Sequence, residues 1–221
     1  PNTRGTMAHY NLAMIGFGNV GRALARLLLR KQEELLAKYN IHFAVTGIAT
    51  GSHGIAINPD GINLVDALDL METSSLSSAD GRKDYPLSRL STMPLSQDAS
   101  MIDFIRNCDA DVLFENSPVN YKTGQPALDH LRTALEAGMH AITANKGPVV
   151  HGYRQLTDLA KAHGLKFYFE STVMDGAPIF SLFREALPGA RLFSFSGVLN
   201  STTNLILTKM EEGLSFEDAV R

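Results

Sequence analysis

The stretch Gly16-Phe17-Gly18-Asn19-Val20-Gly21 decides the fold of this chain. It follows an apolar run at residues 12–15 and opens a long amphipathic segment. In this setting a G-x-G-x-x-G pattern marks a tight turn from a buried strand into a helix. Its first glycine permits the turn, its second lets the backbone approach a pyrophosphate, and its third lets the helix pack on the strand. The amides at the start of the helix then face the anion. We therefore expect all six residues, Gly16, Phe17, Gly18, Asn19, Val20 and Gly21, to bind a dinucleotide.

The bulk properties describe an ordinary globular protein. Its 221 residues, 44% hydrophobic and 19% charged, suit one large domain, or one domain and part of another. A formal net charge of -3 gives no electrostatic reason to expect a nucleic acid or an anionic membrane as partner. Cys108 is the only cysteine, and no apolar run approaches membrane-spanning length. We expect a cytoplasmic protein without disulfides.

The first six residues are polar and precede Met7. They lack the apolar stretch of a signal peptide. We interpret Met7 as the native start and residues 1–6 as left over from cloning.

Strand and helix patterns alternate through most of the chain. Apolar residues at three-to-four spacing predict a helix that ends near residues 39–40, and a buried strand follows at 41–49. Residues 54–100 are irregular, and we expect a surface excursion with short helices at 63–71 and 100–106. Further strands are predicted at 112–115, 140–143 and 166–169, and further helices at 126–137 and 153–163. This alternation predicts an α/β fold with a doubly wound parallel sheet of the Rossmann type over residues 7–170.

The pattern changes after residue 170. We predict a helix at 179–187, a strand at 192–199, a helix at 202–212, and a further helix at 215–220 with Ser215 as its N-cap. These elements indicate that residues 171–221 are the beginning of a second α/β substrate domain. The chain stops inside the last of these helices.

The loop after the second strand bears on the choice of cofactor. An acidic residue at this place binds the ribose 2′-hydroxyl of NAD, but Thr50, Ser52 and His53 offer no carboxylate before Asp60. This loop leaves room for a 2′-phosphate, which Arg22 would assist. The absence of an acid permits NADP without requiring it, and the alternative is a plain solvated turn. We expect NADP rather than NAD, with Thr50 and Ser52 in contact with it.

Two polar residues follow predicted strands at the edge where the glycine turn lies. Ser117 comes after the strand at 112–115, and Lys146 after the strand at 140–143. Ligands bind at the carboxyl ends of the strands in such sheets. We expect Ser117 to contact the ribose or nicotinamide, although Asn-Ser-Pro is also ordinary turn chemistry. We expect Lys146 to lie near the ligand, to donate a charge-assisted hydrogen bond or take part in proton transfer, rather than to be a solvated surface charge.

Two later loops carry less specific signals. The loop from Glu170 to Pro178 combines a carboxylate with free carbonyl groups, which is chemistry for a hard cation. Alternatively, Glu170 caps the helix that starts near Pro178 or pairs with Lys146. The polar residues 200–204 either line a substrate pocket or cap the helix that follows.

Four segments together resemble homoserine dehydrogenase. They are residues 15–22 (I-G-F-G-N-V-G-R), 143–146 (T-A-N-K), 169–173 (F-E-S-T-V) and 198–204 (V-L-N-S-T-T-N). They stand in the family's order and span nearly the whole chain. The glycine turn is shared by many enzymes, whereas T-A-N-K and L-N-x-T-T-N at these separations are fairly specific.

The resemblance implies interconversion of L-homoserine and L-aspartate 4-semialdehyde with NAD(P), on the route to threonine and methionine. Lys146 matches the family's lysine near nicotinamide and substrate. Glu170 and the carbonyls of Val173, Asp175 and Ala177 match a loop that binds a monovalent cation, usually sodium. We assign substrate binding to Thr172, Asn200 and Thr202. Family members commonly dimerise through the substrate domain, which implies a homodimer.

The chain departs from the family pattern in two motifs. The G-x-G of the cation loop reads Met174-Asp175-Gly176, and the glycine of L-N-G-T-T-N is Ser201. The family also has an acidic stretch and a second lysine shortly after the helix where this chain stops. We therefore expect an incomplete substrate site here. The alternatives are another amino-acid oxidoreductase, such as an aspartate dehydrogenase, or a truncated, non-catalytic dinucleotide-binding protein.

Overall fold

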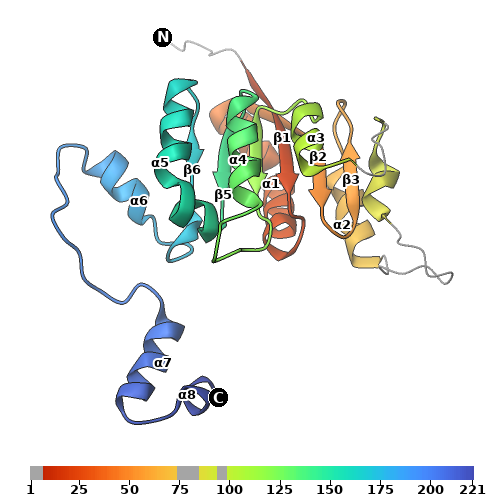
Figure 1. Cartoon of the computed structure of the whole chain (residues 1–221). Coiled ribbons are helices and arrows are strands. Elements are labelled where there is room, and N and C mark those ends of the chain that lie inside the picture. Colours follow the sequence, from red (N-terminus) through yellow and green to blue (C-terminus); the bar gives the residue numbers. More distant parts are fainter. Residues whose placement is uncertain (1–6, 74–84, 94–98) are drawn as a thin grey trace. The chain divides into compact units, whose positions relative to one another are not determined.

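The computed structural model describes residues 7–73, 85–93 and 99–221. Within them a six-stranded sheet has the order β3-β2-β1-β4-β5-β6 (Figure 1). Neighbouring strands are parallel except for the pair β2–β3. The prediction of a doubly wound, mainly parallel sheet is thus confirmed. The strands are β1 Ala8–Ile15, β2 Ile41–Thr50, β3 Gly54–Ile57, β4 Val112–Glu115, β5 His140–Thr143 and β6 Phe167–Tyr168.

The antiparallel strand β3 corrects the sequence prediction, which placed this segment in the irregular excursion. Only residues 51–53 separate β2 from β3. So short a connection joins antiparallel neighbours, because a parallel pair needs a crossover of a dozen residues or more. Residues 1–6, which we interpreted as left over from cloning, lie outside the described residues.

Helices cover both faces of the sheet (Figure 1). On β1, Leu12 and Met14 pack in one core with side chains of α1 and α2, while Ala13 and Ile15 pack in another with α3 and α4. This division follows from the strand, where successive side chains point to opposite faces. A third core lies between α4, α5 and β5. The helices are α1 Asn19–Tyr39, α2 Leu64–Thr73, the 3₁₀ turn η1 Pro86–Leu90, α3 Met101–Asn107, α4 Ala127–Glu136 and α5 Lys146–Ala162.

Helix α5 begins earlier than predicted, at Lys146 rather than residue 153. Pro148 stands in its first turn, where the missing N–H costs no helical hydrogen bond. Gly152 has non-helical dihedral angles, and a Cβ there would lie 2.2 Å from the Leu128 side chain of α4. The first turns of α5 contain Gly147, Pro148 and the kink at Gly152. They therefore lack the regular apolar spacing from which the helix was predicted.

The chain divides between Phe169 and Glu170 into two compact units. The second contains the 3₁₀ turn η2 Glu170–Thr172, α6 Ile179–Ser181 continued by the π-helical turn η3 Leu182–Ala186, α7 Ser201–Glu211 and α8 Phe216–Val220. Ser215 caps α8 as predicted, because its hydroxyl accepts from the Asp218 amide at 3.2 Å. The helices predicted at 179–187, 202–212 and 215–220 are confirmed, each within one residue of its predicted bounds.

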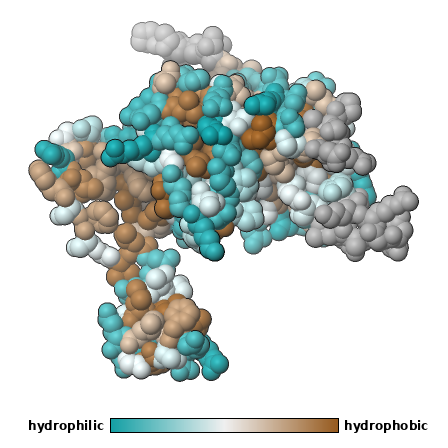
Figure 2. Space-filling view, in the orientation of Figure 1, coloured by the Kyte–Doolittle hydropathy of each residue, from teal (hydrophilic) through white to brown (hydrophobic). Residues whose placement is uncertain are grey.

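The strand predicted at 192–199 is wrong. In the structure these residues form no strand, and the side chains of Phe193 and Phe195 are 86% and 74% exposed. A strand exists only when its backbone pairs with a neighbour. The described residues of the second unit are helical or irregular, so they offer no such partner. Hydrophobic colour marks much of this unit's surface (Figure 2).

No helix in the described ranges has both the length and the apolar character needed to cross a membrane.

Candidate functional site

The glycine turn joins β1 to α1 by close backbone contacts. Gly16 has φ +85°, and a Cβ there would lie 2.4 Å from the Asn116 carbonyl oxygen and 2.9 Å from the Ser117 nitrogen. A Cβ at Gly21 would lie 2.4 Å from the Gly16 carbonyl oxygen. Gly16 therefore adopts a conformation that other residues rarely adopt. It also lets the turn approach the loop after β4 more closely than a side chain would allow. Gly21 allows α1 to pack on the turn itself.

Gly18 differs from its two neighbours in the motif. Its backbone is extended, with φ −79° and ψ −150°, and apart from its two chain neighbours no described residue has a heavy atom within 4 Å of a Cβ built there. The fold itself does not require a glycine at this position. Gly18 is the N-cap of α1, and among the described residues no side chain caps it and no acid stands in the first helical turn. The amides of Asn19 and Val20 therefore present the positive end of a 21-residue helix next to open space, which is the arrangement that binds an anion.

A pocket of about 180 Å³ adjoins the start of α1. It is formed where α1 begins and where β4 and β5 end, since parallel strands bring their carboxyl ends to one edge of the sheet. The structure thus brings together three residues that the sequence predicted for the site: Val20, Ser117 and Lys146. The full lining is Val20, Asn116, Ser117, Val119, Ala144, Asn145 and Lys146.

Asn145 ties the two strand-end loops together. Its Oδ1 accepts from the Gly147 amide at 3.0 Å, which caps α5 and places Lys146 in the first helical turn. Its Nδ2 donates to the Ser117 carbonyl oxygen at 3.1 Å. Sequence reasoning quoted Asn145 within a motif but gave it no role. Its signal was an asparagine directly before a helix, which is a common N-cap.

Two polar atoms of the pocket-lining residues are left without partners. The Asn116 Nδ2 and Ser117 Oγ atoms are buried and form no hydrogen bond among the described residues. Each such atom in a native protein calls for a partner, since burying it unpaired costs free energy. The pocket lining thus combines residues that carry donor groups, Asn116, Ser117 and Lys146, with the apolar residues Val20 and Val119. Together with the open space at Gly18, these residues fit a dinucleotide.

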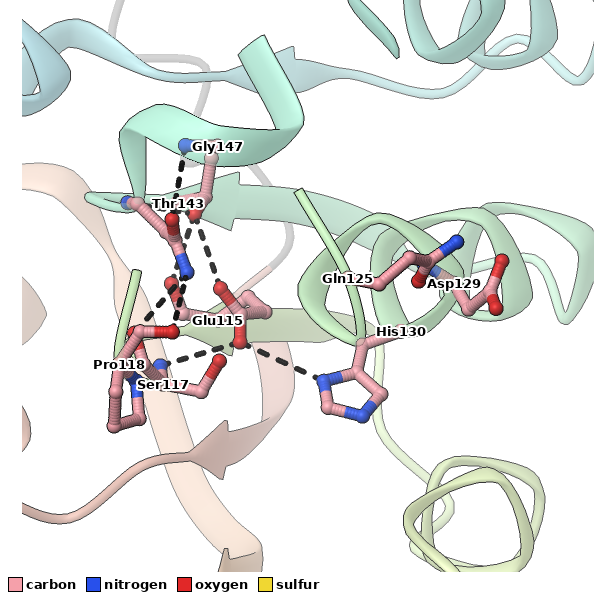
Figure 3. Close-up of polar contacts among 9 residues, drawn as sticks. Glu115, Ser117, Pro118, Gln125, Asp129, His130, Thr143 and Gly147 are labelled. Carbon is pink, nitrogen blue, oxygen red and sulfur yellow. Dashed lines mark hydrogen bonds and ion pairs between the residues drawn. The ribbon is translucent and has the colours of Figure 1, made fainter. Parts of the chain in front are cut away.

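Beneath the pocket lies a buried polar network that sequence reasoning missed (Figure 3). Glu115, the last residue of β4, is fully buried, and its Oε1 accepts from the Ser117 amide at 3.2 Å. Thr143 Oγ1 donates to the Glu115 carbonyl oxygen at 2.9 Å, and His130 Nδ1 of α4 lies 3.5 Å from Glu115 Oε1. The available signal was a glutamate ending a buried strand, because such a residue is rarely fully buried unless paired.

The loop after β2 uses its hydroxyl groups locally. Thr50 Oγ1 accepts from the His53 amide at 2.7 Å, and Ser52 Oγ lies 2.8 Å from His53 Nδ1. The Arg22 guanidinium donates to Asn19 Oδ1 at 3.1 Å. Thr50 and Ser52 therefore build a tight turn and are not among the pocket-lining residues. Contact between these side chains and a 2′-phosphate stays a prediction.

In the second unit, Glu170 caps α6, as the structural alternative proposed. Its Oε1 accepts from the Phe180 amide at 2.9 Å, and its Oε2 accepts from the Ser181 amide at 3.0 Å and from the Ser181 hydroxyl at 2.5 Å. The hydrogen bond from the Ser181 hydroxyl is the main cause that lowers the pKa of Glu170, and the two amides add to it. Glu170 is therefore held as a carboxylate.

The other predicted cation ligands, Val173, Asp175 and Ala177, follow Glu170 in one loop. Met174 and Asp175 take the left-handed conformation, with φ 55° and 45°, where the family pattern has glycine at the first of these positions. No cluster of three or more His, Cys, Asp or Glu side chains in the described ranges is arranged to hold a metal ion. The predicted cation site consists of one carboxylate and backbone carbonyls, so it stays a prediction.

The predicted substrate residues also lie in the second unit. Thr172 is buried, with 1% of its surface exposed, whereas Thr202 is exposed in the first turn of α7. Asn200 Oδ1 accepts from the Thr203 amide at 2.8 Å and so caps α7. This confirms the capping alternative for residues 200–204. Contact of these residues with a substrate stays a prediction.

Comparison with known proteins places both units in one family. The family model described as homoserine dehydrogenase, NAD binding domain, matches residues 16–170, and the model described as homoserine dehydrogenase matches residues 178–221. The homoserine dehydrogenase of Methanocaldococcus jannaschii is 39% identical over 212 residues, which cover 96% of this chain and 59% of that protein. The NAD(+)-dependent homoserine dehydrogenase of Pseudomonas canavaninivorans is 34% identical over 215 residues, with 97% and 57% covered.

Solved structures agree with this assignment. A hyperthermophilic archaeal homoserine dehydrogenase in complex with NADPH is 28% identical and gives a TM-score of 0.73, covering 96% of this chain and 59% of that one. A putative homoserine dehydrogenase from Archaeoglobus fulgidus is 31% identical with a TM-score of 0.72, covering 96% and 58%. The chain thus spans less than two thirds of the length of these relatives.

Proposed function

Because this chain belongs to the homoserine dehydrogenase family, we propose that the protein is an enzyme of that activity. It interconverts L-homoserine and L-aspartate 4-semialdehyde with a nicotinamide dinucleotide. The observation that carries this proposal is the edge of the sheet around Gly18. There an uncapped helix start, open space and a pocket with Lys146 on its wall lie within one unit. The bound cofactor supplies the hydride chemistry, and the residues of this edge bind and orient it.

Each residue of this edge has a distinct binding task. The first amides of α1, at Asn19 and Val20, donate to the pyrophosphate, and Gly18 leaves room for its close approach. The unpartnered Asn116 amide and Ser117 hydroxyl donate to the ribose or nicotinamide. The apolar Val20 side chain covers one wall of the pocket and excludes water from it.

Lys146 is the catalytic residue of the proposal. Lys146 lines the pocket at the start of α5, where Asn145 fixes the backbone. When the aldehyde is reduced, negative charge develops on its oxygen. An ammonium group held nearby stabilises that charge and holds a proton at the oxygen that becomes the hydroxyl group of homoserine.

For the second unit we propose a monovalent-cation loop and part of a substrate site. Glu170 and the carbonyls of Val173, Asp175 and Ala177 would hold the cation, with sodium as the expected ion. The lowered pKa of Glu170 supports this role, since a hard cation needs the carboxylate form. Thr172, Asn200 and Thr202 are the proposed substrate contacts. We further propose that the protein is a cytoplasmic homodimer.

NADP is the proposed cofactor in preference to NAD. The loop after β2 offers hydroxyl groups and His53 and carries no carboxylate before Asp60. Among the relatives, two solved structures of hyperthermophilic archaeal homoserine dehydrogenase are complexes with NADPH, while one protein is named NAD(+)-dependent. Comparing kcat/KM for NADPH and NADH tests the proposal, and a clear preference for NADH would overturn it.

Turnover is measured as loss of NADPH absorbance with L-aspartate 4-semialdehyde as substrate. The proposal predicts saturable oxidation, and no comparable rate with oxaloacetate and ammonia, which an aspartate dehydrogenase would use. Binding of NADPH without turnover of the semialdehyde would instead support a non-catalytic dinucleotide-binding protein.

A further inference from the structure

A carboxyl group and an imidazole are buried together under the candidate pocket, on β4 and α4. Their residues, Glu115 and His130, are 0% and 4% exposed, and Oε1 and Nδ1 lie 3.5 Å apart (Figure 3). We propose that Glu115 and His130 are a positioning pair that fixes Ser117 and thereby sets the affinity of the pocket for the nicotinamide half of the dinucleotide. This inference rests on the proposed function, because it takes the dinucleotide as the ligand.

The pair acts on Ser117 through a closed ring of hydrogen bonds. The Ser117 amide donates to Glu115 Oε1 at 3.2 Å, and Thr143 Oγ1 donates to the Glu115 carbonyl oxygen at 2.9 Å. The Asn145 amide donates to Thr143 Oγ1 at 2.9 Å, and Asn145 Nδ2 donates to the Ser117 carbonyl oxygen at 3.1 Å. The ring holds both polar backbone groups of Ser117, so it fixes the backbone position from which this side chain projects.

The ring leaves the Ser117 hydroxyl without a partner. That oxygen is buried and makes no hydrogen bond among the described residues, although its residue lines the pocket. A buried hydroxyl group without a partner calls for one, and a ligand bound in the adjoining pocket can supply it. The protein thus engages the backbone of Ser117 and leaves its side-chain hydroxyl unpaired.

His130 places an imidazole nitrogen beside the buried Glu115 carboxyl group, from outside the ring. The other groups at Glu115 are an amide and a hydroxyl, both neutral. A carboxylate taken wholly out of water is stable only when it is paired and hydrogen-bonded. The Nδ1 atom of His130 lies 3.5 Å from Glu115 Oε1 and forms no hydrogen bond among the described residues, so it is positioned as the partner of this carboxyl group from α4. Removing the imidazole leaves the carboxyl group without this neighbour and loosens its hydrogen bond to the Ser117 amide.

The affected part of the ligand follows from the sheet. A doubly wound sheet binds a dinucleotide with its two halves on opposite sides of β1. Ser117 and the ring belong to β4 and β5, on the side away from β2. We therefore assign the ring to the nicotinamide half and the loop after β2 to the adenosine half.

This assignment gives a test with two ligands. Dissociation constants are measured by calorimetry for NADPH and for its adenosine half, adenosine 2′,5′-bisphosphate, with the wild-type chain and with Glu115→Gln. We expect the variant to bind NADPH about tenfold more weakly, because the carboxyl acceptor of the Ser117 amide is replaced by the weaker acceptor oxygen of a neutral amide. Its affinity for adenosine 2′,5′-bisphosphate stays within twofold of wild type, which also shows that the variant is folded.

Variants at His130 separate positioning from simple packing. His130→Leu should weaken NADPH binding as Glu115→Gln does. His130→Asn, whose side-chain amide can donate to Glu115, should bind NADPH more tightly than His130→Leu. Thr46→Val is the matched control, since Thr46 has a buried, unpartnered hydroxyl on β2 and does not line the pocket. It should leave both dissociation constants unchanged.

Two results would overturn the inference. One is unchanged NADPH affinity in Glu115→Gln and in His130→Leu, and the other is an equal loss of affinity for both ligands in these variants. Failure of the wild-type chain to bind NADPH or NADH would instead contradict the proposed function. If the wild type binds only NADH, the matching pair of ligands is NADH and ADP, with the same outcomes expected.

Discussion

Gly16 lies against the backbone of Asn116, so closely that a Cβ at Gly16 would be 2.4 Å from the Asn116 carbonyl oxygen. This contact joins the end of β1 to the loop after β4. It therefore fixes the glycine turn relative to the pocket that Asn116 and Ser117 line. Backbone atoms stand on both sides of the contact, so no rotation of a side chain can relieve an added methyl group.

We expect Gly16→Ala to lower the free energy of unfolding by at least about 2 kcal/mol, because alanine at φ +85° is strained and its methyl group meets backbone. Urea denaturation measures this change. Gly189→Ala is the control, since its Cβ would meet no atom within 4 Å, and it should change stability by no more than about 1 kcal/mol. Equal stability of Gly16→Ala and wild type would show that the contact does not exist in solution.

Lys146→Ala should reduce kcat at least about 100-fold in the active protein, because a proton donor near the reacting oxygen is removed. Its denaturation midpoint should stay close to wild type, since the side chain is exposed. Lys161→Ala is the matched control, an exposed lysine in the last turn of the same helix, and should leave kcat unchanged. An unaltered rate in Lys146→Ala would remove this residue from the mechanism.

Much of the fold followed from the sequence because its signals are local. The G-x-G-x-x-G turn and the alternation of apolar strands with amphipathic helices placed α1, β2, β4, α4 and β5 within one or two residues of their bounds, whereas β1 begins four residues before the apolar run at 12–15. The antiparallel strand β3 was missed, because a segment of four residues is too short to show a strand pattern or to indicate that it pairs with β2. The alternation of apolar and polar residues at 192–199 led to a wrong strand prediction for a related reason. A strand forms only when its backbone pairs with a neighbour, and the sequence pattern does not show whether a neighbour exists.

The candidate site was predicted only in part. Ser117 and Lys146 were found because both follow a strand at the edge of the glycine turn. Glu115 and His130 were not, since their pairing joins a strand end to the middle of a helix, and only the fold brings them within 3.5 Å. For Glu170, sequence left capping and cation binding open, and the hydrogen bonds from Phe180 and Ser181 show the capping.

The cap at Glu170 predicts a dependence on pH. Its folded pKa is lowered below the ordinary 4.5, so its stabilisation of α6 is present above that value and is lost as pH falls through the folded pKa. Hydrogen exchange, corrected for intrinsic rates, should show protection of the Phe180 and Ser181 amides that decreases only at strongly acidic pH. In Glu170→Gln this acid-dependent loss should disappear. An identical pH profile in the variant would contradict the cap.

Cys108 should be inert in the folded protein. It is buried on the sheet face covered by α3, and burial raises the pKa of its thiol to about 12. The reactive thiolate is therefore scarce at pH 8. An aromatic disulfide reagent should react with no thiol in the native chain and with one in urea. Rapid reaction of the native protein would show that this side of the core opens readily.

The most direct test of the account is a fluorescence titration of Gly18→Ala with NADPH, beside the wild-type chain. Among the described residues the space next to Gly18 is open, so alanine there should cost only what a weaker N-cap of α1 costs, about 1 kcal/mol. We predict that its methyl group obstructs the pyrophosphate and weakens NADPH binding at least about tenfold. A Gly18→Ala chain that is stable and binds NADPH as tightly as wild type would contradict the claim that this edge of the sheet holds the dinucleotide.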